Sequence, residues 1–215
     1  MPHDHPQRPR WPPLPLARLL MTLYALTVAP VPLLAAPAPG APAVTRVQAL
    51  SRALLRAMKA GPATPATARY RQLEPVIERV FALPFMTRLS VGPDWATFSP
   101  QQRSAVIAAF SRYTIANYAH NFRKFSGQSF KVGDNVIIRG KDEVIQTSLA
   151  SPGATPTSLL YRMRDIDGTW KIVDVYYNGV SQLTLHRVQF ASAIASGGAP
   201  VLVAYLNRTS DNLMK

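Results

Sequence analysis

The longest helical pattern in the chain lies between residues 99 and 125. Ser99 and Gln102 form a capping box and Pro100 occupies the first helical position, so we expect a helix to begin there. At 100° per residue, the bulky aromatic side chains of this segment fall in one half of the helical wheel, together with asparagines and hydroxyl groups. This mixture can line a cavity, although an ordinary core helix whose amides bind nearby backbone is the more common cause of such a pattern.

Three shorter helices are predicted before the long one. The first covers residues 44–59 and ends before Gly61-Pro62, and the second covers residues 64–81. Pro75 lies inside the second, where a kink or a restart of the helix is expected. The third, residues 85–91, ends at Gly92-Pro93.

After residue 127 the hydrophobic period changes from helical to alternating. Short glycine-containing turns separate four predicted strands, which indicates an antiparallel meander: Phe130–Arg139, Glu143–Ser151, Thr157–Ile166 and Thr169–Tyr177. The alternation places Ile145, Thr147, Leu149, Leu159, Tyr161, Met163, Val173, Val175 and Tyr177 on the inner face, and Arg162, Arg164 and Asp174 on the outer face. Two helices, residues 180–196 and 199–207, follow around Gly197-Gly198. The predicted fold is α+β, with helices on one face of a curved, four-stranded antiparallel sheet that encloses an apolar cavity.

The first 43 residues do not resemble folded protein. Three arginines precede an apolar run, residues 19–28, and a proline- and alanine-rich stretch follows, which is the outline of a signal peptide. Cleavage is predicted after Ala43, because proline follows Ala36 and Ala38. The apolar run is short and broken by proline for a bilayer span, so an uncleaved membrane anchor is the less favoured alternative. We therefore expect a leader over residues 1–43, a single domain over residues 44–215, and export to the periplasm.

The amino-acid composition limits the kinds of site and partner that the chain can have. The chain has no cysteine, which removes disulfides, thiol catalysis and thiolate metal sites. Its net charge is +13, and 21 basic and 10 acidic residues remain once the leader is removed. For an exported protein, anionic lipid headgroups are the expected partners of this charge, and nucleic acid is not. The alternative is that the charge serves solubility alone.

Groups suited to catalysis are few. Asp134, Asp142, Glu143, Asp165, Asp167 and Asp211 are assigned to loops, and Asp174, inside a strand, is expected to pair with Arg162 or Arg164. His120 and His186 are assigned to surface or capping positions, because neither has a helical partner suited to metal binding. No nucleotide-binding or nucleophile-elbow motif is present. The sequence predicts neither an enzyme nor a cofactor or metal site.

Three runs carry a family resemblance. They are LPFMTRLSVGPDWATFSPQQRSAVIAAFSRYTIANYAHNF, WKIVDVYYNGVS and RVQFASAIASGG. Together they make the chain, over residues 45 to 207, similar to the MlaC-type periplasmic lipid-binding proteins, also called toluene tolerance proteins, and most similar to the hopanoid-associated HpnM branch. Ala82 departs from this pattern, since many relatives have aspartate after the phenylalanine, and so do residues 184–186.

This resemblance implies a carrier that shields a membrane lipid, either a hopanoid or a phospholipid, in its apolar cavity while the lipid crosses the periplasm. It also implies exchange with an inner-membrane transporter, of the resistance-nodulation-division or the ABC type. Arg88, Arg123 and Lys124 are predicted near the mouth, where they would meet the membrane surface. The residues predicted to bind the ligand are Phe85, Met86, Leu89, Trp95, Val106, Phe110, Tyr113, Asn117, Tyr118, Tyr161, Met163, Val173 and Val175.

Two other functions remain open at this point. A small isomerase or hydratase of a similar cone-shaped fold would need Asp174 or a tyrosine–carboxylate pair to point into the cavity. An envelope adaptor that binds another protein through its basic surface would have a filled core.

Overall fold

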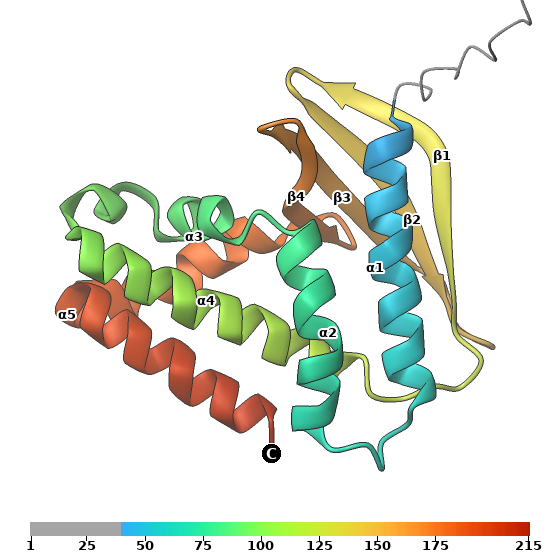
Figure 1. Cartoon of the computed structure of the whole chain (residues 1–215), viewed down its shortest axis with the longest axis horizontal. Coiled ribbons are helices and arrows are strands. Elements are labelled where there is room, and N and C mark those ends of the chain that lie inside the picture. The colour runs from blue at the N-terminus through green and yellow to red at the C-terminus, as the bar shows by residue number, and fades with distance from the viewer. Residues whose placement is uncertain (1–39) are drawn as a thin grey trace, which may run out of the picture. The chain divides into compact units, whose positions relative to one another are not determined.

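The computed structural model describes residues 40–215, and residues 1–39 of the predicted leader lie outside this range. Helix α1, Ala41–Lys59, begins three residues earlier than predicted, and Ala43 is fully buried in it. Cleavage after Ala43 stays a prediction. The following elements are α2 (Ala66–Val80), α3 (Leu83–Val91), a 3-10 helix (Gly92–Thr97) and α4 (Pro100–Asn121), as Figure 1 shows.

The helix signals in the sequence are largely confirmed. Ser99 and Gln102 form the capping box, with Ser99 Oγ accepting a hydrogen bond from the Gln102 N–H at 3.2 Å and Gln102 Oε1 accepting one from the Ser99 N–H at 2.8 Å. The restart at Pro75 does not occur, because α2 continues through that residue. Leu73 and Ile77, both fully buried, hold this part of α2 in the core and offset the hydrogen bond that proline cannot make.

The strands form one antiparallel sheet in the order β1-β2-β3-β4-β5. Four of them match the prediction to within one residue at each end: β1 (Ser129–Arg139), β2 (Asp142–Ala150), β3 (Thr157–Ile166) and β4 (Thr169–Tyr177). The fifth, β5 (Val180–Ser181), corrects the predicted count of four, since a two-residue strand leaves no alternating pattern to detect. It pairs with the end of β4, and Phe81 forms a parallel bridge with Ile172 near the start of β4.

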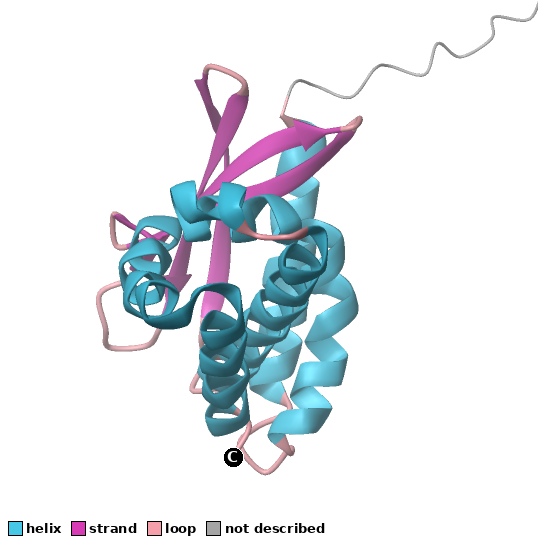
Figure 2. Cartoon of the chain, turned by 90° about the vertical axis from the view of Figure 1, so that its left-hand side faces the viewer, coloured by secondary structure: helices cyan, strands magenta, loops and turns pink. Residues whose placement is uncertain are grey.

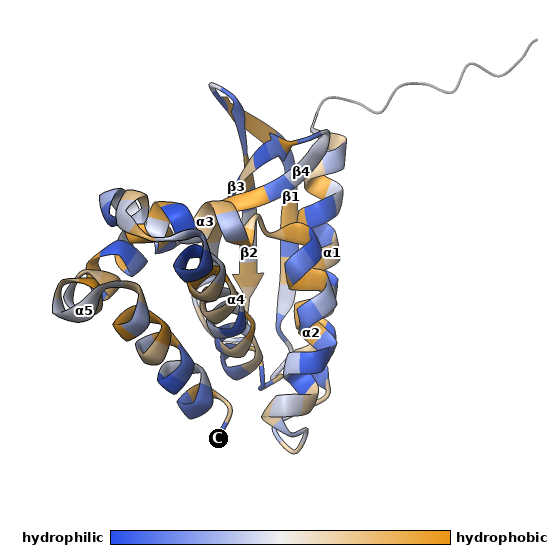
Figure 3. Ribbon diagram, turned by 60° about the vertical axis from the view of Figure 1, so that its left-hand side comes forward, coloured by the Kyte–Doolittle hydropathy of each residue, from blue (hydrophilic) through white to orange (hydrophobic). Residues whose placement is uncertain are grey.

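The helices cover one face of this sheet. Helix α1 runs alongside the strands, and α4 lies between α2 and α5 (Figures 2 and 3). The buried Arg69 of α2 joins these parts, because its guanidinium donates to the carbonyl of Ala119 in α4 at 2.9 Å and to that of Thr64 at 2.6 Å. Helix α4 therefore has neighbours on two sides, and its third side faces the sheet.

Helix α5, Gln182–Leu213, changes direction at Gly197 and Gly198. The φ of +65° at Gly198 lies in the left-handed region that favours glycine. The prediction of two helical segments is thus confirmed, although the first begins two residues later than expected and the second ends at Leu213 instead of Asn207. Among the described residues, α5 is the one helix whose length and composition would suit a membrane span. The change of direction leaves each segment shorter than the roughly 20 residues that a span requires.

Asp142 and Glu143 are not loop residues, as the sequence suggested, but buried residues of β2. Arg164 donates from Nε to Oδ1 of Asp142 at 2.5 Å, and Arg162 donates to Oδ2. Burial alone would raise the pKa of Asp142, but the bonds from Arg164 and Arg162 outweigh it and leave that pKa below its usual value. The two arginines that were expected to pair with Asp174 therefore form salt bridges with Asp142.

Asp174 makes a different set of contacts. Its carboxylate accepts hydrogen bonds from the Val175 N–H at 2.8 Å, the Ser181 hydroxyl at 2.7 Å and the Leu183 N–H at 3.2 Å. The predicted ion pair with Arg162 or Arg164 is wrong, because the carboxylate is directed toward the start of α5. A register shift at this point of the sheet, where Arg162 pairs with Asp174 but Met163 with Ile172, interrupts the alternation.

Glu143 yields a prediction about stability. Its side chain is 6% exposed, Oε2 has no hydrogen-bond partner among the described residues, and burial raises its pKa. A folded-state pKa above the unfolded value of about 4.3 means that ionisation costs stability as pH rises. Glu143→Gln should therefore raise the free energy of unfolding at pH 7, with the gain fading toward pH 4, as measured by urea denaturation.

Asp142→Asn provides the matched control on the neighbouring residue. It should lower the free energy of unfolding at pH 7, because it removes the charge that Arg162 and Arg164 share. A Glu143→Gln variant that is less stable than the parent at pH 7 would show that the Glu143 side chain does not destabilise the fold.

Candidate functional site

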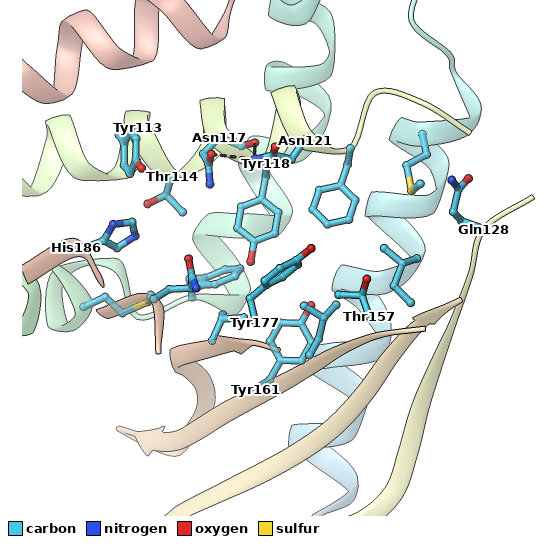
Figure 4. A pocket seen from close by; sticks show the side chains of 18 of the residues that line it. Tyr113, Thr114, Asn117, Tyr118, Asn121, Gln128, Thr157, Tyr161, Tyr177 and His186 are labelled. Carbon is cyan, nitrogen blue, oxygen red and sulfur yellow. Dashed lines mark hydrogen bonds between the residues drawn. The ribbon is translucent and has the colours of Figure 1, made fainter. Parts of the chain in front are cut away.

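A cavity of about 520 Å³ lies between α4 and the inner face of the sheet. Figure 4 shows side chains of α4 on one wall and of β3 and β4 on the opposite wall. The most exposed lining residues are Asn121, Lys124 and Tyr177, so the cavity opens between the ends of α4 and β4. The lining residues are Met58, Phe81, Met86, Phe110, Tyr113, Thr114, Asn117, Tyr118, Asn121, Phe122, Lys124, Gln128, Leu149, Ser151, Thr157, Leu159, Tyr161, Val175, Tyr177, Gln182 and His186.

Helix α4 supplies much of one wall through its i, i+3, i+4 and i+7 positions. The mixed aromatic and polar half of the helical wheel therefore faces a cavity, which decides between the two interpretations of that pattern. Of the thirteen residues predicted to bind a ligand, the structure brings seven together on the cavity wall: Met86, Phe110, Tyr113, Asn117, Tyr118, Tyr161 and Val175.

Three predicted residues from the segment before α4 lie elsewhere. Leu89 and Trp95 line a separate, open groove with Arg88, Arg103 and Arg187. Phe85 lies beneath the guanidinium groups of Arg88 and Arg164, 5.5 and 5.1 Å from its ring centroid. Helix α3 is only nine residues long, so only the side that carries Met86 faces the cavity.

The other three absent residues are buried in the core without lining the cavity. Val106 is fully buried one helical turn before Phe110, and Met163 is fully buried on β3. Val173 is the residue left without a partner by the register shift of β4, so Ile172 takes the place opposite Met163. A strict alternation along the strand cannot predict a bulge. The bulge displaced Val173 from the face on which it was expected.

Of the three cations predicted near the mouth, one lines the cavity and two lie elsewhere. Lys124 lines the cavity at its open side. Arg88 faces the separate groove, and Arg123 donates to the carbonyl of His120 at 3.1 Å.

His186 is a lining residue that sequence reasoning assigned to the surface. Its ring stacks on Phe190 with 5.4 Å between centroids, and it meets Phe110 and Tyr113 edge-on at 5.7 and 5.6 Å. Burial lowers the pKa of His186, although Gln189 and Asp174 act in the opposite direction, so the neutral ring is favoured. Phe190 lies four positions later on the same helical face. This spacing was the signal in the sequence that could have placed the His186 ring on the cavity wall.

His120 behaves as predicted for a capping position. Its Nδ1 lies 3.0 Å from the carbonyl oxygen of Leu213, near the C-terminal end of α5. It does not approach the cavity, so the two histidines of the described chain have different roles.

Most polar groups of the α4 wall already have partners within the helix. Asn121 Nδ2 donates to Asn117 Oδ1 at 2.9 Å, and the Thr114 hydroxyl donates to the Phe110 carbonyl at 2.9 Å. Burial raises the pKa of Tyr118 well above its usual value and also raises that of Tyr161, so both phenols stay protonated at neutral pH. The wall therefore carries no ionised acid, and it suits an apolar molecule with a few polar groups.

The structure gives little support to catalysis at this cavity. Asp174 is not among the lining residues, and its carboxylate is held by three donors. Among residues 40–215 there is no group of three or more histidine, aspartate or glutamate side chains placed to hold a metal ion. An isomerase that uses Asp174 as its base would need that carboxylate to face the substrate.

Comparison with known proteins bears on the fold and on the family of the chain. A crystal structure of a phospholipid-binding protein from Ralstonia solanacearum, in complex with a phospholipid, has a similar fold with a TM-score of 0.71. The two sequences are 22% identical, and the similarity covers 81% of this chain and 100% of the Ralstonia chain. The sequence model of the MlaC protein family matches residues 48–208, most of the described chain. The chain therefore belongs to the MlaC protein family, as its sequence motifs predicted.

Proposed function

We propose that this protein is a periplasmic carrier that encloses part of a membrane lipid in its cavity and moves that lipid between membranes. The observation that carries the proposal is the cavity itself, which lies between an aromatic helix face and an apolar sheet face and is open at one side. Membership of the MlaC family and the phospholipid-binding Ralstonia protein support a lipid ligand. A hopanoid ligand and a transporter of either predicted type remain parts of the proposal.

Burial of apolar surface is sufficient to retain such a ligand. Removing about 300 Å² of acyl-chain surface from water contributes about 7.5 kcal/mol, at about 25 cal/mol per Å². Loss of translational freedom and ordering of the chain reduce this value. The remainder suits a carrier, because the lipid is held during diffusion and is released without any covalent step.

Lipid occupancy tests the cavity directly. Phe110→Arg places a charge among lining residues and should abolish lipid binding, because a charge in an apolar cavity disfavours acyl chains. Leu149→Trp, at a half-buried position of the wall, should reduce occupancy by filling space and covers the case in which the arginine variant does not fold. Native mass spectrometry of protein purified without detergent measures both.

Ile138→Arg is the matched control, because Ile138 is 63% exposed on β1 and does not line the cavity. Its lipid occupancy should equal that of the parent. A parent protein of bare mass, from which solvent extraction recovers no lipid, would refute the carrier. The adaptor alternative would then stand, with partner binding that Phe110→Arg leaves unchanged.

Exposed apolar side chains lie close in sequence to residues that line the cavity. On one side, Tyr177 and Val180 are 52% and 56% exposed where β4 and β5 pair, and Leu185 and Val188 are exposed on the first turns of α5. On the other side, Phe125 is 40% exposed, directly after Lys124. We call Phe125, Tyr177, Val180, Leu185 and Val188, with Lys124, the rim.

The lysines at the rim form no salt bridge within the described residues, and the nearby carboxylate of Asp174 is buried and bonded to Ser181 and Leu183. Lys124 belongs to it, and the ammonium of Lys59 lies 5.4 Å from the Phe125 ring centroid. Residues 95–133, 144–164 and 175–210, which include most of the lining residues, contain no aspartate or glutamate. Apolar groups beside uncompensated cations are complementary to an anionic bilayer surface, so the rim is the proposed membrane contact.

Vesicle binding tests this contact. The double variant Leu185→Ser and Val188→Ser, and separately Lys124→Glu, should each reduce co-sedimentation with vesicles that contain anionic phospholipid, by about threefold or more. The effect of Lys124→Glu should shrink as salt rises, because exposed charges are screened.

The controls lie on β1, away from the mouth. Ile138→Ser and Arg139→Glu make comparable changes at exposed positions and should leave vesicle binding near the parent value. If these controls weaken binding as much as the rim variants do, the attraction reflects net charge alone.

A further inference from the structure

Two tyrosines face each other across the middle of the cavity. Tyr118 belongs to α4 and Tyr161 to β3, and Figure 4 shows both side chains directed into the space between these elements. Tyr161 is 1% exposed, and its register partners Ile145 and Val175 are also buried. The cavity therefore has one buried phenol group, on Tyr161, and one half-buried phenol group, on Tyr118.

Packing fixes the direction of the Tyr118 ring. It stacks on Phe122 with 5.6 Å between centroids and an angle of 10°, and it meets Phe81 edge-on at 5.5 Å. A tyrosine ring has only two side-chain torsions, so these contacts leave its hydroxyl little choice of position. The Tyr118 hydroxyl is thus presented to the cavity by a rigid support.

Neither hydroxyl has a hydrogen-bond partner among the described residues, whereas Asn117, Asn121 and Thr114 on the same wall do. Once a ligand fills the cavity and covers these hydroxyls, each needs a partner, because a buried unpaired hydroxyl costs free energy. Both phenols are protonated at neutral pH, so each has a hydrogen to donate. The missing partner is therefore an acceptor on whatever enters the cavity.

We propose that Tyr118 and Tyr161 donate hydrogen bonds to the ester carbonyl oxygens of an acyl lipid and so select ester-linked lipids over ligands without carbonyl groups. The inference rests on the proposed carrier function and names the ligand class of the same cavity. An ester carbonyl is the acceptor that lies between the headgroup and the acyl chains of such a lipid. The middle of the cavity, between its mouth and its aromatic wall, is the matching position.

The alternative ligand class fits these groups less well. A polycyclic hydrocarbon skeleton offers no acceptor, so it would cover both hydroxyls and leave them unpaired. A site that can hydrogen-bond its ligand discriminates strongly against an analogue that lacks the bonding group. The two tyrosines therefore favour an ester-linked lipid over a hopanoid as the ligand that fits this cavity best.

A pair of phospholipids that differ in one linkage tests the inference. The protein is mixed with vesicles that contain equal amounts of a diacyl phospholipid and its dialkyl ether analogue, with the same headgroup and chain lengths. Native mass spectrometry then gives the ratio of the two lipids bound. The parent protein should prefer the ester by about 25-fold, since each of the two hydrogen bonds contributes about fivefold.

Tyr118→Phe with Tyr161→Phe should bring this ratio close to one while total lipid occupancy is kept, because only the two hydroxyls are removed. Each single variant should give an intermediate ratio. Tyr70→Phe, on α2 and outside the cavity, is the matched control and should leave the ratio unchanged.

Different results would overturn the role of the two tyrosines and the carrier function. Equal uptake of both analogues by the parent, or an unchanged ester preference in the double variant, overturns the role of the tyrosines and leaves the carrier intact. A parent protein that takes up neither lipid overturns the carrier, and the role of the tyrosines with it.

Discussion

Hydrogen bonds along the outer edge of β4 attach the helical layer to the sheet. Near the start of β4, the Ala82 N–H donates to the Ile172 carbonyl at 2.9 Å, which fixes the entry to α3. Near its end, the carboxylate of Asp174 accepts from Leu183 and Ser181, which fixes the start of α5. Both attachments lie on one strand, so α4 can stand away from β3 without loss of backbone pairing. A cavity between the layers is compatible with this arrangement, whereas attachments on every strand would draw the layers together.

Aromatic contacts explain how the walls keep their shape. Rings packed on rings have few torsions, so each ring restricts the position of its neighbours. The series Phe81, Tyr118, Phe122 and Phe130 is connected by centroid distances of 5.5 to 6.2 Å, and it joins α4 to both the β4 edge and β1. Leucine and isoleucine at the same positions could adjust their rotamers and fill the space. The unusual composition of α4 is therefore a requirement of the cavity.

Local signals in the sequence predicted local structure well. The cap at Ser99, the turns between strands and the break at Gly197-Gly198 all depend on residues close together in the chain, and each was found in the structure. The errors involve partners distant in sequence or a change of register. Asp142 is buried because Arg162 and Arg164 reach it from the next strand, and Val173 is displaced by a bulge. His186 joins the wall only when α5 packs against α4, a contact that helical periodicity cannot reveal.

The distribution of charge suits a carrier that must leave a membrane as readily as it arrives. Carboxylates are absent from the segments that include most of the lining residues, so attraction to an anionic surface would act on the side where the lipid would pass. Exposed charges are screened within about 8 Å at physiological ionic strength, which makes this attraction short-ranged. The exposed apolar groups are few and separate, unlike a membrane-spanning helix. In the proposed carrier, orientation at the surface and weak attachment would arise from the same residues, and the cavity would retain the lipid.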